Sequence, residues 1–263
     1  MPFTPAHAAA VFPFRRTRLV WSALIVGTMA PDFEYFLRLA PEGRHGHTMP
    51  GVFLLTLPLA MVTLWLFHRF VKTPFVELMP DGLKRRLTPY AAEFRFGRTS
   101  RFALIVASVM VGILTHLIWD SFTHPNGWSV LHWPLLQHRI HLPFVGGAPI
   151  YRPLQNASTV FGMAFLLVWL AVWYRSADVN SQPPARSEST SPAKKVMTLV
   201  SITAVAGIIA VVVSLASTGI PQDLRAIPHF LVPVVVAAIA IMWWEFVLLG
   251  IVRSTRKTSQ SAS

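Results

Sequence analysis

Long runs of hydrophobic residues alternate along this chain with short polar segments. Five of the runs are long enough to cross the hydrocarbon core of a bilayer, which takes about 20 apolar residues in a helix. They cover residues 50–67, 102–119, 158–174, 196–218 and 229–252. The pattern predicts an all-α, polytopic membrane protein.

A sixth hydrophobic run is shorter and covers residues 19–31. The stretch before it, MPFTPAHAAAVFPF, is also apolar, which leaves two arrangements open. In the first, residues 19–31 form a transmembrane helix and His7 lies on the surface. In the second, the two apolar stretches form a short helical hairpin, and His7 returns to the level of Asp32. We therefore expect about six transmembrane helices, the first of them either a single span or a hairpin.

Positive charges gather in alternate connections between the expected helices. Lys and Arg residues are frequent before residue 19, between residues 67 and 102, in residues 175–195 and after residue 252, and they are sparse in the other connections. By the positive-inside rule, both chain ends are cytoplasmic, and we expect the cytoplasmic (inner) membrane of a bacterium. The formal net charge of +12 follows from this topology. It favours contact with anionic membrane lipids and predicts no nucleic-acid partner, because no recognition fold accompanies it.

The sequence SADVNSQPPARSESTSPAKK, residues 176–195, is rich in Ser and Pro and is typical of a flexible linker. It divides the chain into a membrane domain of residues 1–175 and a pair of further transmembrane helices in residues 196–252. Residues 253–263 are expected to form a disordered basic tail.

Side chains able to bind a metal ion collect near the ends of the expected helices that face away from the cytoplasm. Only nitrogen and oxygen donors are present, because the chain has no cysteine, and such donors suit zinc or a similar divalent ion. The candidate ligands are His7, Asp32, Glu34, His45, His47, His116, Asp120 and His124. Asp32 and Asp120 are also candidate catalytic residues, since a carboxylate that is not a ligand can accept a proton.

The stretch HLIWDSFTHP, residues 116–125, is the most informative of these segments. His116 and Asp120 are four residues apart, so on a helix they face the same side and can share one ion. His124 precedes a proline, which disfavours helix at that position, so the chain turns His124 either back toward the pair or away from it. The competing interpretation is a hydrogen-bonded pair that only fastens two helices. Likewise, His45 and His47 can be solvated loop residues, and Asp32 and Glu34 an interfacial acidic pair.

Four segments in order resemble the bacterial membrane proteins of domain-of-unknown-function family 4184, over about residues 1–175. These segments are MPFTPAH (1–7), MAPDFEYF (29–36), HGHT (45–48) and HLIWDSFTHP (116–125). More distantly, the order of His, Pro-Asp, a His pair and HxxxD is similar to membrane-bound metal-dependent hydrolases and zinc-dependent phospholipase C. That resemblance implies ligand roles for His7, Asp32, His45 or His47, His116 and Asp120, and less directly for Glu34 and His124. A later His and Glu motif of the phospholipases has no counterpart here, so one or two metal ions are expected and not three.

Together these features predict a membrane-embedded, metal-dependent hydrolase that acts on a phosphate-bearing lipid at the outer membrane interface. The alternatives are non-enzymatic. A transporter would use the same groups to bind a metal or relay protons, and an assembly protein would use them to fasten helices.

Overall fold

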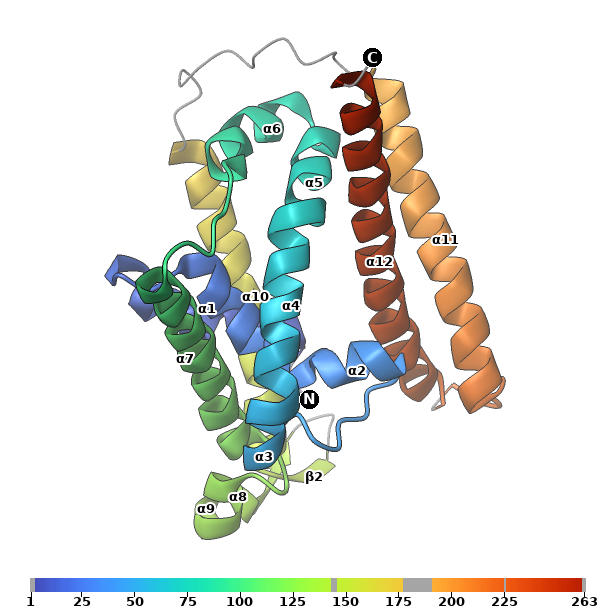
Figure 1. Ribbon diagram of the computed structural model, residues 1–263. Helices are drawn as coiled ribbons and strands as arrows, with labels where there is room; N and C mark the ends of the chain where they lie inside the picture. Colours follow the sequence, from blue (N-terminus) through green and yellow to red (C-terminus); the bar gives the residue numbers. More distant parts are fainter. Residues whose placement is uncertain (1–2, 143–145, 177–190, 225, 262–263) are drawn as a thin grey trace. The chain divides into compact units, whose positions relative to one another are not determined.

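The chain is folded almost entirely into helices in a computed structural model that describes residues 3–142, 146–176, 191–224 and 226–261 (Figure 1). The first part contains η1 (Thr4–Arg16), α1 (Trp21–Met29), η2 (Ala30–Asp32), α2 (Phe33–Arg38), α3 (Met49–Gly51), η3 (Val52–Thr56), α4 (Leu57–Leu66), η4 (Phe67–Val71), α5 (Lys72–Leu78), α6 (Asp81–Leu87) and η5 (Thr88–Ala91). The second part contains α7 (Thr99–Thr123), α8 (Trp128–His132), α9 (Pro134–Gln137), strands β1 (Arg139–Leu142) and β2 (Gly146–Pro149), α10 (Tyr151–Ser176), α11 (Pro192–Thr218) and α12 (Ile227–Ser261).

Among the described residues, five helices are long and apolar enough to cross a membrane. They cover Met49–Leu78, Thr99–His132, Tyr151–Ser176, Pro192–Thr218 and Ile227–Arg256. The first of them is continuous from α3 to α5 and includes two π-helical stretches, η3 and η4. These helices confirm the expectation of an all-α, polytopic membrane protein.

The expectation that residues 19–31 form a transmembrane helix is wrong. Helix α1 has only nine residues, about 14 Å of helix at 1.5 Å per residue, which is less than half of a bilayer core. It forms a hairpin with η1, and the hydroxyl of Thr28 in α1 lies 3.3 Å from the backbone oxygen of His7, to which it donates. His7 is 4% exposed, so the hairpin arrangement is confirmed and the surface position for His7 is wrong.

The described residues divide into two compact units, and each is considered by itself. The first unit contains residues 1–33, 44–61 and 96–175, and the second contains residues 34–43, 62–95 and 176–263. This division differs from a boundary at the linker alone, because residues 34–43 and 62–95 group with the chain after residue 176.

The first unit is built around the packing of α1 on α7. Leu24, Val109 and Ile113 are fully buried there. Gly112 allows the two helices to approach closely, since a Cβ atom at this position would lie 2.4 Å from the backbone oxygen of Leu24. On its other side the hairpin packs against α10, where the ring of Phe12 meets the ring of Phe165 edge to face at 4.7 Å.

The second unit places α11 beside α12 (Figure 1). Its core cluster joins Val71 and Leu78 to Phe246 and Val247 of α12. Lys195 of α11 donates to Asp81 at 2.8 Å, and the hydrogen bond holds the pKa of Asp81 below its usual range.

The start of α11 and the end of α12 differ from the sequence expectation. Residues 177–190 of the expected linker lie outside the described residues, but α11 already begins at Pro192, where the Ser191 hydroxyl accepts from the backbone N–H of Lys194 at 3.3 Å. Such a cap satisfies a backbone donor that the first turn leaves without an intrahelical partner. Helix α12 continues to Ser261 and so includes most of the residues expected to form a disordered tail.

Candidate metal centre

Five of the candidate ligands converge in the first unit from four separate segments. His7 comes from η1, Asp32 from η2, His47 from the loop before α3, and His116 and Asp120 from α7. Two groups of three side chains could each hold a metal ion: His7, His116 and Asp120, and Asp32, His47 and His116. The two groups share His116, so they form one continuous cluster.

Two histidines each lie close to two carboxylates, at separations near those between the ligand atoms of a tetrahedral ion. Nε2 of His116 lies 3.2 Å from Nε2 of His47, 3.2 Å from Oδ2 of Asp120 and 3.7 Å from Oδ1 of Asp32. Nε2 of His47 lies 3.5 Å from each of these carboxylate oxygens. Bonds of about 2.0–2.1 Å to a tetrahedral ion separate its ligand atoms by roughly 3.3 Å, so these residues fit a small divalent ion.

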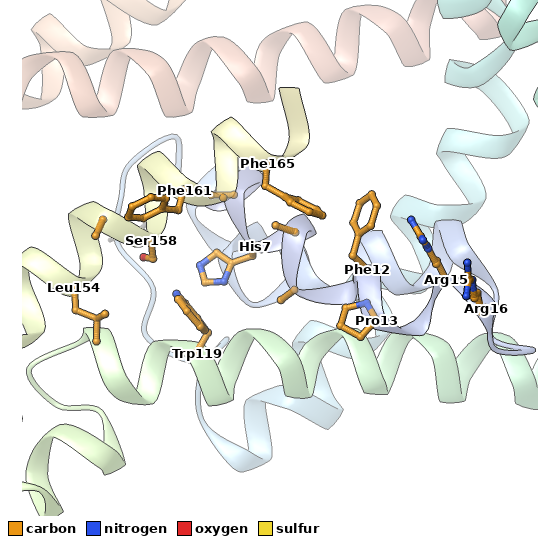
Figure 2. Close-up of a pocket in the computed structure, with 15 residues that line it drawn as sticks. His7, Phe12, Pro13, Arg15, Arg16, Trp119, Leu154, Ser158, Phe161 and Phe165 are labelled. Atoms are coloured by element: carbon orange, nitrogen blue, oxygen red, sulfur yellow. The ribbon is translucent and has the colours of Figure 1, made fainter. Parts of the chain in front are cut away.

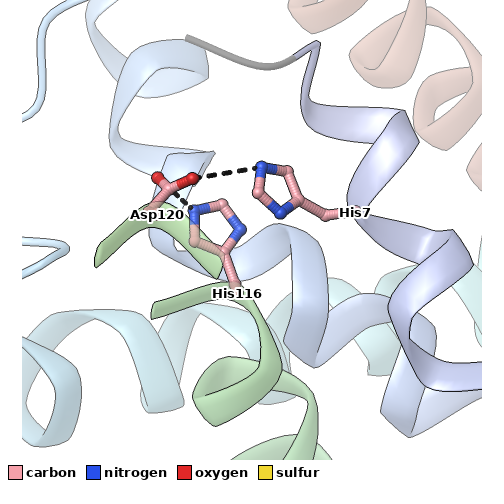
Figure 3. Close-up of side chains that lie close together, drawn as sticks. All are labelled: His7, His116 and Asp120. Atoms are coloured by element: carbon pink, nitrogen blue, oxygen red, sulfur yellow. Dashed lines mark ion pairs between the residues drawn. The ribbon is translucent and has the colours of Figure 1, made fainter. Parts of the chain in front are cut away.

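His7 meets the other oxygen of Asp120 (Figure 3). Nε2 of His7 lies 3.5 Å from Oδ1 of Asp120, while Oδ2 faces His116. The His7 and His116 rings stack with centroids 3.9 Å apart. Burial, and then the neighbouring His116, lower the pKa of His7 to about 3, so its ring is neutral and can offer a lone pair to an ion. Each carboxylate oxygen of Asp120 can therefore bind an ion, Oδ1 beside His7 and Oδ2 beside His116.

A backbone carbonyl orients the shared histidine. Nδ1 of His116 lies 2.8 Å from the backbone oxygen of Thr28, and a carbonyl only accepts, so Nδ1 carries the proton. Nε2 is then left to act as a ligand, in the arrangement by which metal-binding histidines are commonly fixed.

A hydroxyl group orients Asp32 in a comparable way. The Thr4 hydroxyl donates to Oδ2 of Asp32 at 2.7 Å, which leaves Oδ1 turned toward His47 and His116. Because Thr4 lies in η1 and Asp32 in η2, this bond also ties the start of the hairpin to its end.

The loop of His47 is held by two threonines. The Thr48 hydroxyl donates to the backbone oxygen of His45 at 2.8 Å and accepts from the N–H of Gly51 at 3.1 Å, which caps α3. The Thr56 hydroxyl, in the π-helical stretch η3, donates to the backbone oxygen of Gly46 at 3.0 Å. These bonds fix the backbone on both sides of His47 and direct its ring into the cluster.

Several ligand atoms in the cluster have no hydrogen-bond partner among the described residues. They are Nε2 of His7, Oδ1 of Asp32 and Oδ1 of Asp120, all of them buried. Buried polar atoms are nearly always satisfied, so this concentration fits residues that hold a cation. An ion beside His7 would satisfy Nε2 of His7 and Oδ1 of Asp120, and an ion beside His47 would satisfy Oδ1 of Asp32.

Three candidate ligands from the sequence take other positions. Glu34 is buried but belongs to the second unit, where Arg38 donates to its Oε1 from Nε and Nη2 at 3.0 and 2.8 Å. His45 is exposed and belongs to neither group of three. His124 turns back toward Asp120, because α7 ends at Thr123 and extended backbone at His124 brings its Nδ1 to 3.4 Å from Oδ2 of Asp120.

Sequence reasoning missed the threonines that orient the ligands: Thr4, Thr28, Thr48 and Thr56. Only Thr48 carried a local signal, since Thr directly before a helix is a typical cap. The additional histidines of the loop after α7 join neither group of three; His132 stacks on Trp128 with ring centroids 4.4 Å apart and lies 2.7 Å from its backbone oxygen.

The chain belongs to the family described as Domain of unknown function (DUF4184), whose model matches residues 1–251. The match therefore extends through most of α12, beyond the residues 1–175 expected from the four motifs. Neither the curated proteins nor the solved structures include a match to this chain.

Proposed function

We propose that this protein is a membrane-embedded, metal-dependent hydrolase that cleaves a phosphoester bond in a lipid or a similar substrate at the membrane interface. One observation carries the proposal: five buried or half-buried His and Asp side chains converge with their ligand atoms turned toward one another. The order of the motifs suggests the same chemistry, but no match to a curated protein or a solved structure supports a likeness to metal-dependent hydrolases. We place the protein in the bacterial inner membrane, in contact with membrane lipids and without a nucleic-acid partner.

Zinc is the ion that the donor set suits best. His47 and His116 offer ring nitrogens, and the Nε2 of each lies 3.2–3.7 Å from Oδ1 of Asp32 and from Oδ2 of Asp120. When bound, such an ion lowers the pKa of a coordinated water toward neutrality and stabilises negative charge on a phosphoryl oxygen.

A hydrolase also needs a ligand position that the protein leaves open. His7 and Oδ1 of Asp120 supply only two further ligand atoms on the other side of the Asp120 carboxylate. An ion at this second position would share the Asp120 carboxylate with the first and keep room for water and substrate. Paired ions of this kind are common in enzymes that cleave phosphoesters.

The remaining groups of the site can hold and move a proton. With an ion only beside His47, Oδ1 of Asp120 can accept a proton, because it has no hydrogen-bond partner among the described residues. Nδ1 of His124 lies 3.4 Å from Oδ2 of the same carboxylate, so His124 is a second basic group at the site.

The test is hydrolysis by the full chain reconstituted in vesicles with added zinc or manganese. A panel of phosphate-bearing lipids serves as substrate, and released phosphate or phosphorylated headgroup is measured. Asp120→Asn should lower the rate at least a hundredfold, whereas His45→Ala, which changes an exposed histidine of the neighbouring loop, should retain it. Equal rates for the wild type and Asp120→Asn would refute the assignment.

A second candidate function is a structural metal centre. It is favoured by the convergence of two histidines and two carboxylates, since closed sites with four protein ligands usually stabilise a fold. In this case the ion fastens the hairpin and the His47 loop to α7. Metal removal would then lower the unfolding temperature while no lipid phosphate in the panel is hydrolysed.

A further inference from the structure

An apolar cavity of about 910 Å³ lies along η1 in the first unit. Figure 2 shows the lining side chains between η1, α7 and α10. Most of them are small or aromatic, including Ala10, Phe12, Phe161 and Phe165. Such a lining suits a hydrocarbon chain, because burying apolar surface in it is favourable and few polar groups need partners.

The two ends of the cavity differ in chemistry. His7 and Trp119 line one end, and Arg15 and Arg16 line the other, with Phe12 between them (Figure 2). Nine residues of η1 separate His7 from Arg16, which is about 18 Å at the 2.0 Å rise of a 3₁₀ helix. The cavity is therefore long enough to hold an extended chain with a charged group at one end.

Arg15 and Arg16 end η1, just before the turn into α1. The turn that follows them is fixed to α7, since the backbone N–H of Val20 donates to the Ser108 hydroxyl at 2.9 Å. None of the described carboxylates forms an ion pair with Arg15 or Arg16, so both guanidinium groups are available to an anionic ligand at this end of the cavity.

We propose that the cavity binds one chain of an anionic phospholipid, whose phosphate is held by Arg15 and Arg16 and whose chain runs along η1 to His7 and Trp119. The ligand is anionic because two guanidinium groups lie at this end of the cavity. Each guanidinium group can donate two parallel hydrogen bonds to the oxygens of a phosphate. The bound lipid is a ligand and not the substrate, because its phosphate lies at the end of the cavity away from the metal cluster. Its chain covers the apolar flank of His7.

The test is lipid retention by the detergent-purified full chain, measured by native mass spectrometry after incubation with vesicles of phosphatidylglycerol or phosphatidylcholine. About one phosphatidylglycerol per protein should remain bound to the wild type and to Arg18→Gln, a matched control for a neighbouring arginine that does not line the cavity. The double variant Arg15→Gln/Arg16→Gln should retain at least tenfold less. Inorganic phosphate should not displace the lipid, since it cannot fill the apolar part.

A second variant tests the cavity itself. Ala10→Trp places a large side chain in the space for the hydrocarbon and should also abolish retention, with both arginines intact. Equal retention by the wild type and the double arginine variant, equal retention of phosphatidylcholine, or full retention by Ala10→Trp would overturn the proposal. Metal content is measured on the same samples and should not change, so this site and the proposed hydrolase can fail separately.

Discussion

Gly27 of α1 packs directly against the backbone of Val109 in α7. A Cβ atom at Gly27 would lie 2.2 Å from the backbone oxygen of Val109, so no other residue fits without moving the two helices apart. The neighbouring Thr28 supplies the carbonyl that orients His116. The close approach of these helices and the geometry of the metal centre therefore depend on each other.

Gly27→Ala should destabilise the protein and weaken metal binding together. Forcing a methyl group into a packed contact typically costs about 1–3 kcal/mol, and any separation of α1 from α7 moves Thr28 away from His116. Thermal unfolding in detergent and metal content by elemental analysis measure the two effects. The control is Gly207→Ala in α11, where a Cβ atom meets no described atom within 4 Å; it should keep its metal and unfold at the same or a slightly higher temperature.

His47→Ala should lose bound metal, and His45→Ala should keep it. Both residues belong to the same HGHT motif, but only His47 reaches the cluster, with its Nε2 3.2 Å from Nε2 of His116, while His45 is exposed. Elemental analysis of the purified variants after incubation with zinc compares them. Equal metal content in the two variants would contradict the placement of the loop.

Thr4→Val should weaken metal binding about 10- to 100-fold, the usual cost of losing a group that orients a ligand. Valine has nearly the shape of threonine but cannot donate the 2.7 Å hydrogen bond to Asp32, so Oδ1 of Asp32 loses its fixed orientation. The affinity is measured by competition with a zinc-binding dye. Thr4→Ser keeps the hydroxyl and should retain near wild-type affinity; if both variants behave alike, the hydroxyl has no orienting role.

Glu34→Gln should leave the bound metal in place, whereas Asp32→Asn should release it. The two carboxylates are two residues apart in the same motif, but Glu34 is paired with Arg38 and Oδ1 of Asp32 faces His47 at 3.5 Å. Metal content of both variants, compared at equal protein concentration, tests the difference. Metal loss in Glu34→Gln with an unchanged unfolding temperature would return Glu34 to the ligand set.

Much of the fold could be predicted from hydrophobicity alone. The five long helices were predicted because a helix that crosses a bilayer must be continuously apolar over about 20 residues, and that requirement is visible in the sequence. The start of α11 and the end of α12 were misjudged, since polar residues extend a helix once it is nucleated and capped, and composition does not reveal where the extension stops.

The candidate site could be predicted in part. The i, i+4 spacing of His116 and Asp120 placed both on one helical face, and both lie in the cluster. The spacing could not distinguish His47 from His45, or Asp32 from Glu34, because a loop or a short helix does not reveal which of two nearby side chains points inward. It also could not find Thr4, whose partner Asp32 is distant in sequence.

The sequence by itself determined that this is a helical membrane protein with His and Asp residues suited to a divalent ion. The length of an apolar run and the kinds of donor atom depend only on which residues are present, and not on tertiary contacts. The tertiary structure decided that residues 4–29 form a hairpin, that His7, Asp32 and His47 meet His116 and Asp120, and that a cavity runs along η1. The physical reason is that these contacts join residues far apart in the chain. They depend on the close packing of α1 on α7 and on backbone hydrogen bonds such as that of Thr28 to His116.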